Sequence, residues 1–350
     1  MDKKIGFWRR LLQIAAIGYP LSLLAVLVTL RWIGERWWVS TTALYLPRWP
    51  FAAPLPLLAL ALALAGPRRL FLTQVAALLL LVPLLGFTLS LPRHASGTDR
   101  LRIFSLNVNG AACPPDELAE QVTALQADVA VFQEAHDELA AVLAAKLPAY
   151  HVQASGQFVL ASRYPILEMV EPPKILYRDL LRSPRFVRFR LRGPQGTFLM
   201  YVVHPPSPRE GLSELYGDGL RTEIETGRIL KNGRALSVIT AVAGLRTAQM
   251  CNVGDDAGSA TDPVIIAGDT NLPGSSWAFA HCLGRFQDGF ARVGNGFGYT
   301  FPSTKRRRPW MRIDRVLADD HFRFLHFEVA PAMSSDHRGV IADLEWAVAR

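Results

Sequence analysis

Cysteine is scarce in this chain: only Cys113, Cys251 and Cys282 occur among 350 residues. Three cysteines cannot build the framework of a small disulfide-rich secreted protein. The sequence also lacks a Cys-x-x-Cys pair and any Cys/His spacing typical of a structural zinc site. A bridge between Cys251 and Cys282 would be permitted outside the cytoplasm, but we expect free thiols, because unpaired buried cysteine is common in protein cores.

Acidic residues are nearly missing from the first 92 residues, which contain nine Lys or Arg but only Asp2 and Glu35. Residues 93–350 contain 29 basic and 28 acidic residues, so the formal net charge of +8 comes from the N-terminal part. The remainder is close to neutral and has no stripe of interleaved basic and aromatic residues. This composition argues against a nucleic-acid-binding protein.

Long apolar runs are concentrated in the same N-terminal part. LLQIAAIGYPLSLLAVLVTL (11–30) and LFLTQVAALLLLVPLLGFTLSL (70–91) are uncharged and have about the 20 residues that a transmembrane helix needs. A third run, Phe51–Ala65, is shorter and contains Pro54 and Pro56 near its start, so it spans only with help from residues 44–50 or with a thin, tilted geometry. We expect three transmembrane helices, at about 11–30, 50–66 and 70–91.

Four tryptophans, Trp32, Trp37, Trp38 and Trp49, crowd the segment between the first two runs, as aromatic rings do at a membrane surface. A cleaved signal peptide is the alternative for residues 1–30, but that run is longer than a usual signal sequence and further apolar segments follow it. We therefore expect a multi-pass cell-membrane anchor over residues 1–92, a linker at 93–100 and a second domain at 101–350.

Basic residues predict the orientation of this anchor. They precede the first and last spans, at Lys3, Lys4, Arg9, Arg10, Arg68 and Arg69. Such residues favour the cytoplasmic side, so three crossings would place the C-terminal domain outside the cytoplasm. Arg31, Arg36 and Arg48 lie in the opposite loop and weaken this bias. If the middle run does not cross, the same argument places the domain in the cytoplasm.

After residue 100, strand and helix patterns alternate. LRIFSLNV (101–108) alternates like a strand, Leu118, Val122 and Leu125 share one face of a helix, and ADVAVFQ (127–133) reads as a buried strand. A long helical pattern at 219–247 precedes another strand-like run at 263–267. These signals indicate an α/β domain.

Polar residues follow the strand-like runs one after another. They are Asn107, Glu134, His204, Asp269, Asn271, Asp314, Asp336 and His337. Open α/β structures place their chemistry at strand ends, so we expect these side chains to converge. Carboxylates, amides and two histidines are the groups that a metal-assisted attack on a phosphate ester requires.

The motifs around these residues resemble those of the endonuclease/exonuclease/phosphatase superfamily, also called DNase I-like, over roughly residues 100–347. In chain order they are SLNVNG (105–110), FQEAH (132–136), LASRYPI (160–166), VVHPPSP (202–208), IAGDTNLPGSS (266–276), RIDRVLAD (312–319) and SSDHRGV (334–340). The resemblance implies an α/β four-layer sandwich, in which two packed mixed β-sheets are flanked by helices.

A magnesium site is expected among these residues. Mg²⁺ prefers oxygen ligands and is usually held by one or two carboxylates together with substrate phosphate. Glu134 and Asp336 suit that role, with Asn107 adding a neutral oxygen, and Mn²⁺ is an alternative ion. Taken singly, Glu134 could be a first-turn helix residue and Asp336 a helix N-cap.

The resemblance also implies catalytic roles for the remaining residues. Asp269 orients or deprotonates the attacking water, and Asn271 hydrogen-bonds the phosphate or that water. Asp314 pairs with His337 and fixes its tautomer. His204 donates to phosphate oxygens or helps protonate the leaving group. The abasic-site endonuclease branch has Tyr in place of His204, so that branch is disfavoured.

The other histidines, His94, His136, His151, His281, His321 and His326, follow no motif, and we expect surface or structural roles for them. The run from Lys305 to Arg308 is interpreted as a hairpin tip, either solvated or placed to contact anionic lipid headgroups.

The function expected from the sequence is therefore a membrane-anchored, Mg²⁺-dependent phosphoesterase. Several spans followed by this domain resemble the bacterial branch that includes glycopeptide (teicoplanin/vancomycin) resistance membrane proteins. That resemblance implies a phosphorylated lipid, such as an isoprenoid carrier, as the substrate at the bilayer. An extracytoplasmic nuclease and a catalytically inert binding or scaffold domain are the alternatives.

Overall fold

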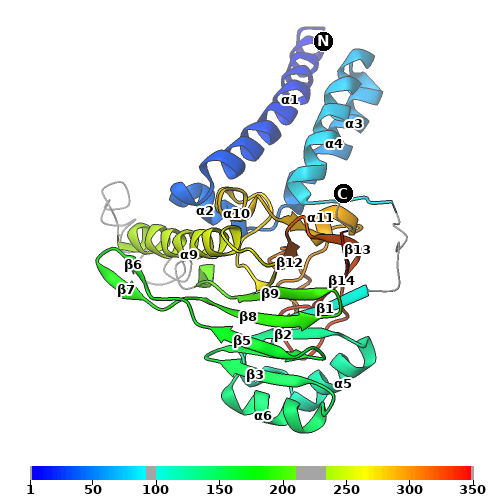
Figure 1. Ribbon diagram of the computed structural model, residues 1–350. Helices are drawn as coiled ribbons and strands as arrows, with labels where there is room; N and C mark the ends of the chain where they lie inside the picture. Colours follow the sequence, from blue (N-terminus) through cyan, green and yellow to red (C-terminus); the bar gives the residue numbers. More distant parts are fainter. Residues whose placement is uncertain (1, 92–99, 210–233, 348–350) are drawn as a thin grey trace.

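The computed structural model describes residues 2–91, 100–209 and 234–347. Apolar helices project from one side of a layered α/β domain (Figure 1). The linker expected at 93–100 lies outside the described residues except for Arg100, which begins β1. His94 also lies outside them.

Two six-stranded mixed sheets form the domain. The first has the order β13 (Phe322–Val329), β14 (Val340–Trp346), β1 (Arg100–Asn107), β2 (Val129–Gln133), β4 (Phe158–Ser162) and β3 (His151–Ser155). The second has the order β11 (Gln287–Asp288), β12 (Asp314–Ala318), β10 (Val264–Asp269), β9 (Gly196–Val203), β8 (Phe186–Gly193) and β5 (Ile166–Val170). A small hairpin of β6 (Ile175–Tyr177) and β7 (Leu180–Arg182) extends beyond them.

The two sheets pack face to face, and helices cover their outer faces. Side chains such as Ile103, Val131, Met200 and Ile265 fill the core between the sheets. On the first sheet, α5 (Pro115–Leu125) and α6 (Asp137–Lys146) bury their apolar faces against a second core. On the second sheet, α9 (Arg234–Gly258) and α10 (Trp277–Leu283) do the same. The expected four-layer sandwich is therefore confirmed.

Helix α9 extends further than its sequence pattern predicted. The pattern covered 219–247, of which 219–233 lie outside the described residues, whereas the helix continues to Gly258. Met250, Val253 and Ala257 keep its buried face on the second sheet, so packing carries the helix past the expected end.

The expectation that all three cysteines are free was wrong for two of them. Cys251 of α9 and Cys282 of α10 form a disulfide with a Cα–Cα distance of 4.4 Å, and Cys113 is a buried free thiol. The pairing depends on α9 and α10 lying side by side, which the spacing of the two cysteines in the sequence does not reveal.

The N-terminal part contains α1 (Asp2–Val28), α2 (Trp38–Tyr45), α3 (Pro54–Ala65) and α4 (Phe71–Leu85). Two helical stretches, Gly6–Arg36 and Arg68–Leu85, are long and apolar enough to cross a membrane. A third crossing requires that Trp38–Tyr45 and Trp49–Ala65, which are bent by 85°, form one broken span. The last span ends six residues before the expected position 91, because Gly86 adopts the left-handed conformation and Thr88 pairs with Gly296 of the domain.

The segment between α1 and α3 is docked on the domain. It contains η1 (Thr29–Ile33), η2 (Gly34–Arg36) and α2. The buried Glu35 carboxylate accepts hydrogen bonds from Ser276 Oγ (2.5 Å) and Ala278 N (3.1 Å), at the start of α10. A negative charge is stabilised at a helix N-terminus. Gly34, at φ +51°, lies so close to Trp277 that a Cβ would clash.

Candidate active site

Strand register in the second sheet brings three of the expected residues to one edge. β9 and β10 are parallel, with Val203 opposite Gly268, so His204 and Asp269 follow at the same level. β10 and β12 are antiparallel, and Asp269 lies directly opposite Asp314. Residues far apart in the sequence therefore meet at one level because of strand pairing.

The first sheet delivers the other residues to the same place. β1 and β2 are parallel, with Asn107 opposite Gln133, so Glu134 comes directly after the pair. The loop before β14 runs past the end of β1, and Ser335 Oγ donates to Asn107 O at 2.6 Å. This contact anchors the Asp336–His337 turn beside Asn107.

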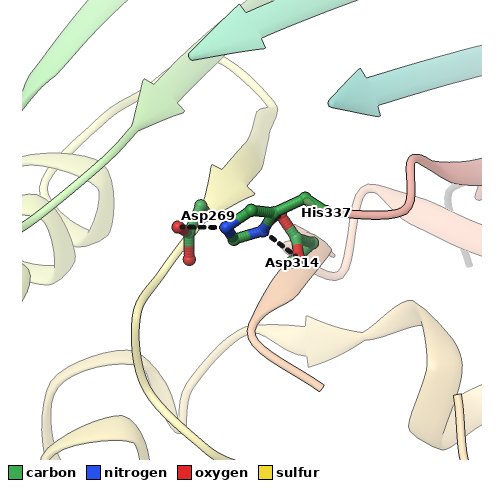
Figure 2. Close-up of side chains that lie close together, drawn as sticks. All are labelled: Asp269, Asp314 and His337. Atoms are coloured by element: carbon green, nitrogen blue, oxygen red, sulfur yellow. Dashed lines mark hydrogen bonds and ion pairs between the residues drawn. The ribbon is translucent and has the colours of Figure 1, made fainter. Parts of the chain in front are cut away.

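His337 is held by two carboxylates (Figure 2). Its Nδ1 lies 3.0 and 3.1 Å from the two oxygens of Asp314, and its Nε2 lies 3.7 Å from Asp269 Oδ2. Burial alone would lower the pKa of His337, but the Asp314 and Asp269 carboxylates outweigh it and raise that pKa to about 9. The imidazole is therefore protonated at neutral pH, with Nδ1–H donating to Asp314.

His204 also approaches Asp269, but its pKa shifts in the direction opposite to that of His337. Its Nδ1 is 2.7 Å from Gln157 Oε1, and its Nε2 is 3.3 Å from Glu134 Oε1 and 3.6 Å from Asp269 Oδ2. Burial lowers the pKa of His204. With Gln157 oxygen as acceptor, Nδ1 carries the proton of the neutral ring. Buried Nε2 has no hydrogen-bond partner of suitable geometry among the described residues, so it is available to a ligand.

Asp269 is the centre of the group. Its side chain is buried, and burial raises its pKa although His337 opposes the shift. Asn271 N donates to Oδ1 at 2.8 Å and Asn107 Nδ2 donates to Oδ2 at 3.3 Å. The Asn271 side chain donates to Pro205 O at 3.0 Å. A carboxylate with a raised pKa, fixed by donors on both oxygens, is suited to accept a proton from water.

A small cavity opens beside these groups. Its volume is about 30 Å³, enough to hold a water molecule, and its lining includes the carboxylates of Glu134, Asp269 and Asp336 as well as the basic side chains of His204, Arg209 and His337. Hard oxygen donors around a space of this size suit a divalent cation. Asn107 Nδ2 donates to Glu134 Oε1 at 2.9 Å, while its oxygen accepts from Asn109 N, so Asn107 orients Glu134 in this arrangement.

Asp269, Asp314 and His337 form a second group of potential metal ligands, with one donor atom from each within 4.8 Å of the others. This group could hold a metal ion. However, the hydrogen bond between His337 Nδ1 and Asp314 would have to be broken if Nδ1 were the ligand. The Glu134 carboxylate is partly exposed, and a metal ion bound there would leave the hydrogen bond between His337 and Asp314 intact.

Three nearby residues were not predicted from the sequence. Gln157 fixes the ring of His204, as described above. Arg209 pairs with Asp336 Oδ2 at 2.7 Å and lies 4.7 Å from the centre of the Phe301 ring, whose other neighbour is His337 at 4.5 Å. Arg209 directly follows the VVHPPSP motif, a signal that could have identified it. Gln157 and Phe301 carry no comparable signal.

The N-terminal part also contacts the loops of the site. Tyr45 of α2 donates its hydroxyl to Asn271 O at 2.9 Å. Arg246 of α9 donates to Tyr45 Oη at 2.5 Å and to Pro206 O at 2.9 Å. Tyr45 and Arg246 thus connect the loop after β9 with the loop after β10. The described histidines outside the site are all exposed, at His136, His151, His281, His321 and His326.

Comparison with known proteins agrees with this geometry. The profile of the Endonuclease/Exonuclease/phosphatase family matches residues 104–337. No curated protein matches the sequence significantly.

Solved structures share the fold at low identity. An endonuclease/exonuclease/phosphatase family protein from Bacteroides thetaiotaomicron has a TM-score of 0.52 at 15% identity, covering 70% of this chain and 94% of that one. A mannosyl-6-phosphatase from the same species has a TM-score of 0.50 at 16% identity, covering 70% and 100%. D. rerio TDP2, complexed with a single-strand DNA product, has a TM-score of 0.51 at 17% identity, covering 71% and 100%.

Proposed function

Because the chain belongs to the endonuclease/exonuclease/phosphatase family, we propose that it is a membrane-anchored, metal-dependent phosphoesterase. The observation that carries this proposal is the buried arrangement of His204 and His337 on either side of Asp269, with Asp314 behind His337. Asp269 is a proton acceptor, His337 is a cation and His204 has an available imidazole nitrogen. All three line the same small cavity. A purely structural cluster has no need for a buried carboxylate with a raised pKa.

In this proposal Glu134 and Asp336 hold Mg²⁺ or Mn²⁺, with Asn107 orienting Glu134. The ion, when bound, would neutralise charge on the phosphate and polarise the ester. Asp336 is paired with Arg209, so Arg209 is available to turn from the carboxylate to a phosphate oxygen. Arg209 is more than half exposed, which leaves it free to move.

The remaining steps are carried by this chain's own side chains. Asp269 orients the attacking water and takes its proton. His337, kept cationic by Asp314, binds the negatively charged oxygen that develops in the transition state. His204, with its proton on Nδ1, presents an unprotonated Nε2 that accepts a hydrogen bond from a protonated phosphate oxygen or from a bound water. Asn271 keeps Asp269 in place through its backbone N–H.

We further propose that the substrate is a phosphorylated membrane lipid, as in the membrane-anchored branch that includes glycopeptide-resistance proteins. The position of the site supports this class: α2 contacts the loop that carries Asn271, and α2 follows a candidate membrane span. A nuclease is the second candidate, because the exposed residues Lys305–Arg308 are basic and a structural relative is complexed with single-strand DNA.

The test uses the full-length protein purified in detergent with Mg²⁺, Mn²⁺ or a chelator. Lipid phosphates, lipid pyrophosphates, phosphodiesters and single-stranded DNA are supplied as substrates. We expect metal-dependent hydrolysis of a lipid phosphate that Asp269→Asn abolishes and that His326→Ala, at an exposed histidine, leaves unchanged. Faster cleavage of DNA than of any lipid would favour the nuclease. No hydrolysis of any substrate with any metal would contradict the proposal.

A further inference from the structure

A second, larger cavity lies where the apolar helices meet the domain. Its volume is about 530 Å³, within the range of small-molecule binding sites. From α1 it is lined by Leu24, Leu27 and Val28, and from the end of α4 by Pro83 and Leu85. The domain side is formed by the loops at 273–275, 297–299 and 310–312. One end of this junction cavity is therefore apolar and lies between two candidate membrane spans.

The lining of the junction cavity also includes cationic side chains. Arg31, Arg48 and Arg312 line it, and no lining residue is Asp or Glu. Arg312 is paired with Asp288. Arg48 donates only to the carbonyl oxygens of Leu44 and Leu84, and Arg31 has no carboxylate partner in the described chain. Two uncompensated guanidinium groups favour an anionic occupant.

An unpartnered hydroxyl points to the same kind of occupant. Ser275 lines the junction cavity, and its buried Oγ has no hydrogen-bond partner within the described ranges. Buried polar atoms are nearly always satisfied, so an exception calls for a ligand or an ordered water. A head group with acceptor oxygens would satisfy Ser275 and the two arginines together.

The junction cavity adjoins the catalytic cavity. Met311 lines both cavities. The loop after β10 contributes Asn271 to the catalytic cavity and Pro273, Gly274 and Ser275 to the junction cavity. A molecule seated between α1 and α4 would therefore lie next to the loop that carries Asn271.

We infer that the junction cavity binds the phosphate-bearing lipid whose ester the domain hydrolyses, with the hydrocarbon chain between α1 and α4 and the head group near Arg31, Arg48 and Ser275. The statement that the bound lipid is hydrolysed rests on the proposed function. The inference adds that the membrane helices form part of the substrate site and that a long apolar chain is recognised. Trp32 and Trp310 also line the cavity, and tryptophan is enriched where a membrane protein meets the bilayer surface.

The experiment compares two substrates and two matched variants of the full-length protein in lipid nanodiscs. Leu24→Trp fills the junction cavity, whereas Leu60→Trp makes the same change on α3, which contributes no lining residue. We expect Leu24→Trp to lower kcat/KM for a long-chain prenyl phosphate by about tenfold or more, as steric changes in apolar pockets do. A short-chain, water-soluble phosphoester should be hydrolysed at the wild-type rate by both variants.

A binding measurement separates this inference from the proposed function. A long-chain alkyl phosphate with a diazirine at its chain end is photolysed with the protein, and the labelled peptides are identified by mass spectrometry. We expect labelling of residues 24–32 or 83–88, reduced by Leu24→Trp and by Arg31→Gln. Labelling without hydrolysis of any substrate would support the cavity and contradict the proposed function. Hydrolysis with labelling elsewhere, or equal effects of both tryptophans, would overturn the inference.

Discussion

The pairing of His337 with Asp314 shows how one buried contact can set the charge of a side chain. Asp314 is completely buried and both its oxygens face the imidazole. Since each group depends on the other, they should act as a unit in the reaction.

We expect His337→Ala and Asp314→Asn each to lower kcat by about 10²–10⁴-fold, as loss of a positioned acid or base does. The double variant should be no slower than the slower single variant, because either change already removes the cationic imidazole. Metal-dependent turnover and thermal melting are measured together on all three proteins. Multiplying effects in the double variant would argue against the pairing.

A second residue-scale feature lies away from the site. The Asp288 side chain is 10% exposed and binds the guanidinium groups of Arg312 and Arg315 at 2.7 and 2.5 Å. Burial alone would raise the pKa of Asp288, but the two arginines outweigh it and hold that pKa below its usual value. The folded state therefore gains stability from this carboxylate whenever the pH is above its unfolded pKa, and loses the gain as the pH falls through the folded pKa.

Asp288→Asn should lower the free energy of unfolding by about 3–5 kcal/mol at neutral pH, because it leaves the buried Arg315 and the partly buried Arg312 without their charge partner. Asp320→Asn, at an exposed carboxylate, is the control. Thermal unfolding from pH 7 down to acidic pH should show the difference between wild type and Asp288→Asn shrinking below the carboxyl titration. A pH-independent difference would mean that Asp288 acts through packing alone.

At the scale of elements, the sequence predicted the strands that carry the site residues but few of the contacts that other elements make with them. Asn107, Asp269 and Asp314 lie at strand ends. The sequence identifies them because an apolar run bordered by a polar residue is a local pattern. Gln157, Tyr45 and the Cys251–Cys282 bridge were missed. Each depends on a contact between separate elements, which no local pattern encodes.

Helix α2 provides an element-scale prediction. Tyr45→Phe removes the hydroxyl that joins Asn271 O to Arg246, and we expect kcat on a soluble phosphoester to fall by about tenfold through displacement of the Asn271 loop. Tyr19→Phe removes a hydroxyl that donates to Phe51 O within the anchor and should leave kcat unchanged. Unaltered melting temperatures with unaltered kcat in Tyr45→Phe would show that the docked helix does not position the loop.

The hairpin at 301–311 presents the basic run as an exposed tip. Phe301 pairs with Met311 at its base and Thr304 with Arg307 near its end. Replacing Lys305, Arg306, Arg307 and Arg308 by Ser should weaken hydrolysis of lipid phosphate in anionic vesicles, since each basic residue near such a surface adds about 1 kcal/mol of attraction. Hydrolysis of the soluble ester should not change. Equal losses on both substrates would instead indicate a role in the catalytic cavity.

At the scale of the whole molecule, the directions of α1, α3 and α4 bear on which side of a membrane the domain lies. In Figure 1, α1 and α4 run toward the domain, and α3 runs away from it. The pair α3–α4 therefore leaves and returns on the domain side whether or not it crosses the bilayer. If α1 spans the membrane, the domain and the N-terminus lie on opposite sides, whether or not the middle run crosses. A re-entrant middle run therefore does not move the domain into the cytoplasm, as the sequence alone had suggested.

We accordingly expect the domain outside the cytoplasm. The disulfide between Cys251 and Cys282 agrees with an oxidising compartment. A reporter that is active only outside the cytoplasm, fused after Arg350, should be active, and one that works only in the cytoplasm should be silent. The reverse result would place the N-terminus outside and the catalytic residues inside.

The docking of Glu35 on the start of α10 has a mechanical consequence. Glu35, Tyr45 and Thr88 each contact the domain, at Ser276, Asn271 and Gly296 respectively, in addition to the covalent connection of the chain. Cutting the chain at that connection would not release the domain, because the two fragments would remain bound to each other. If α1 and α4 span a membrane as we propose, this docking would hold the candidate active site at a fixed height and tilt above the bilayer, which would limit it to esters presented at that height.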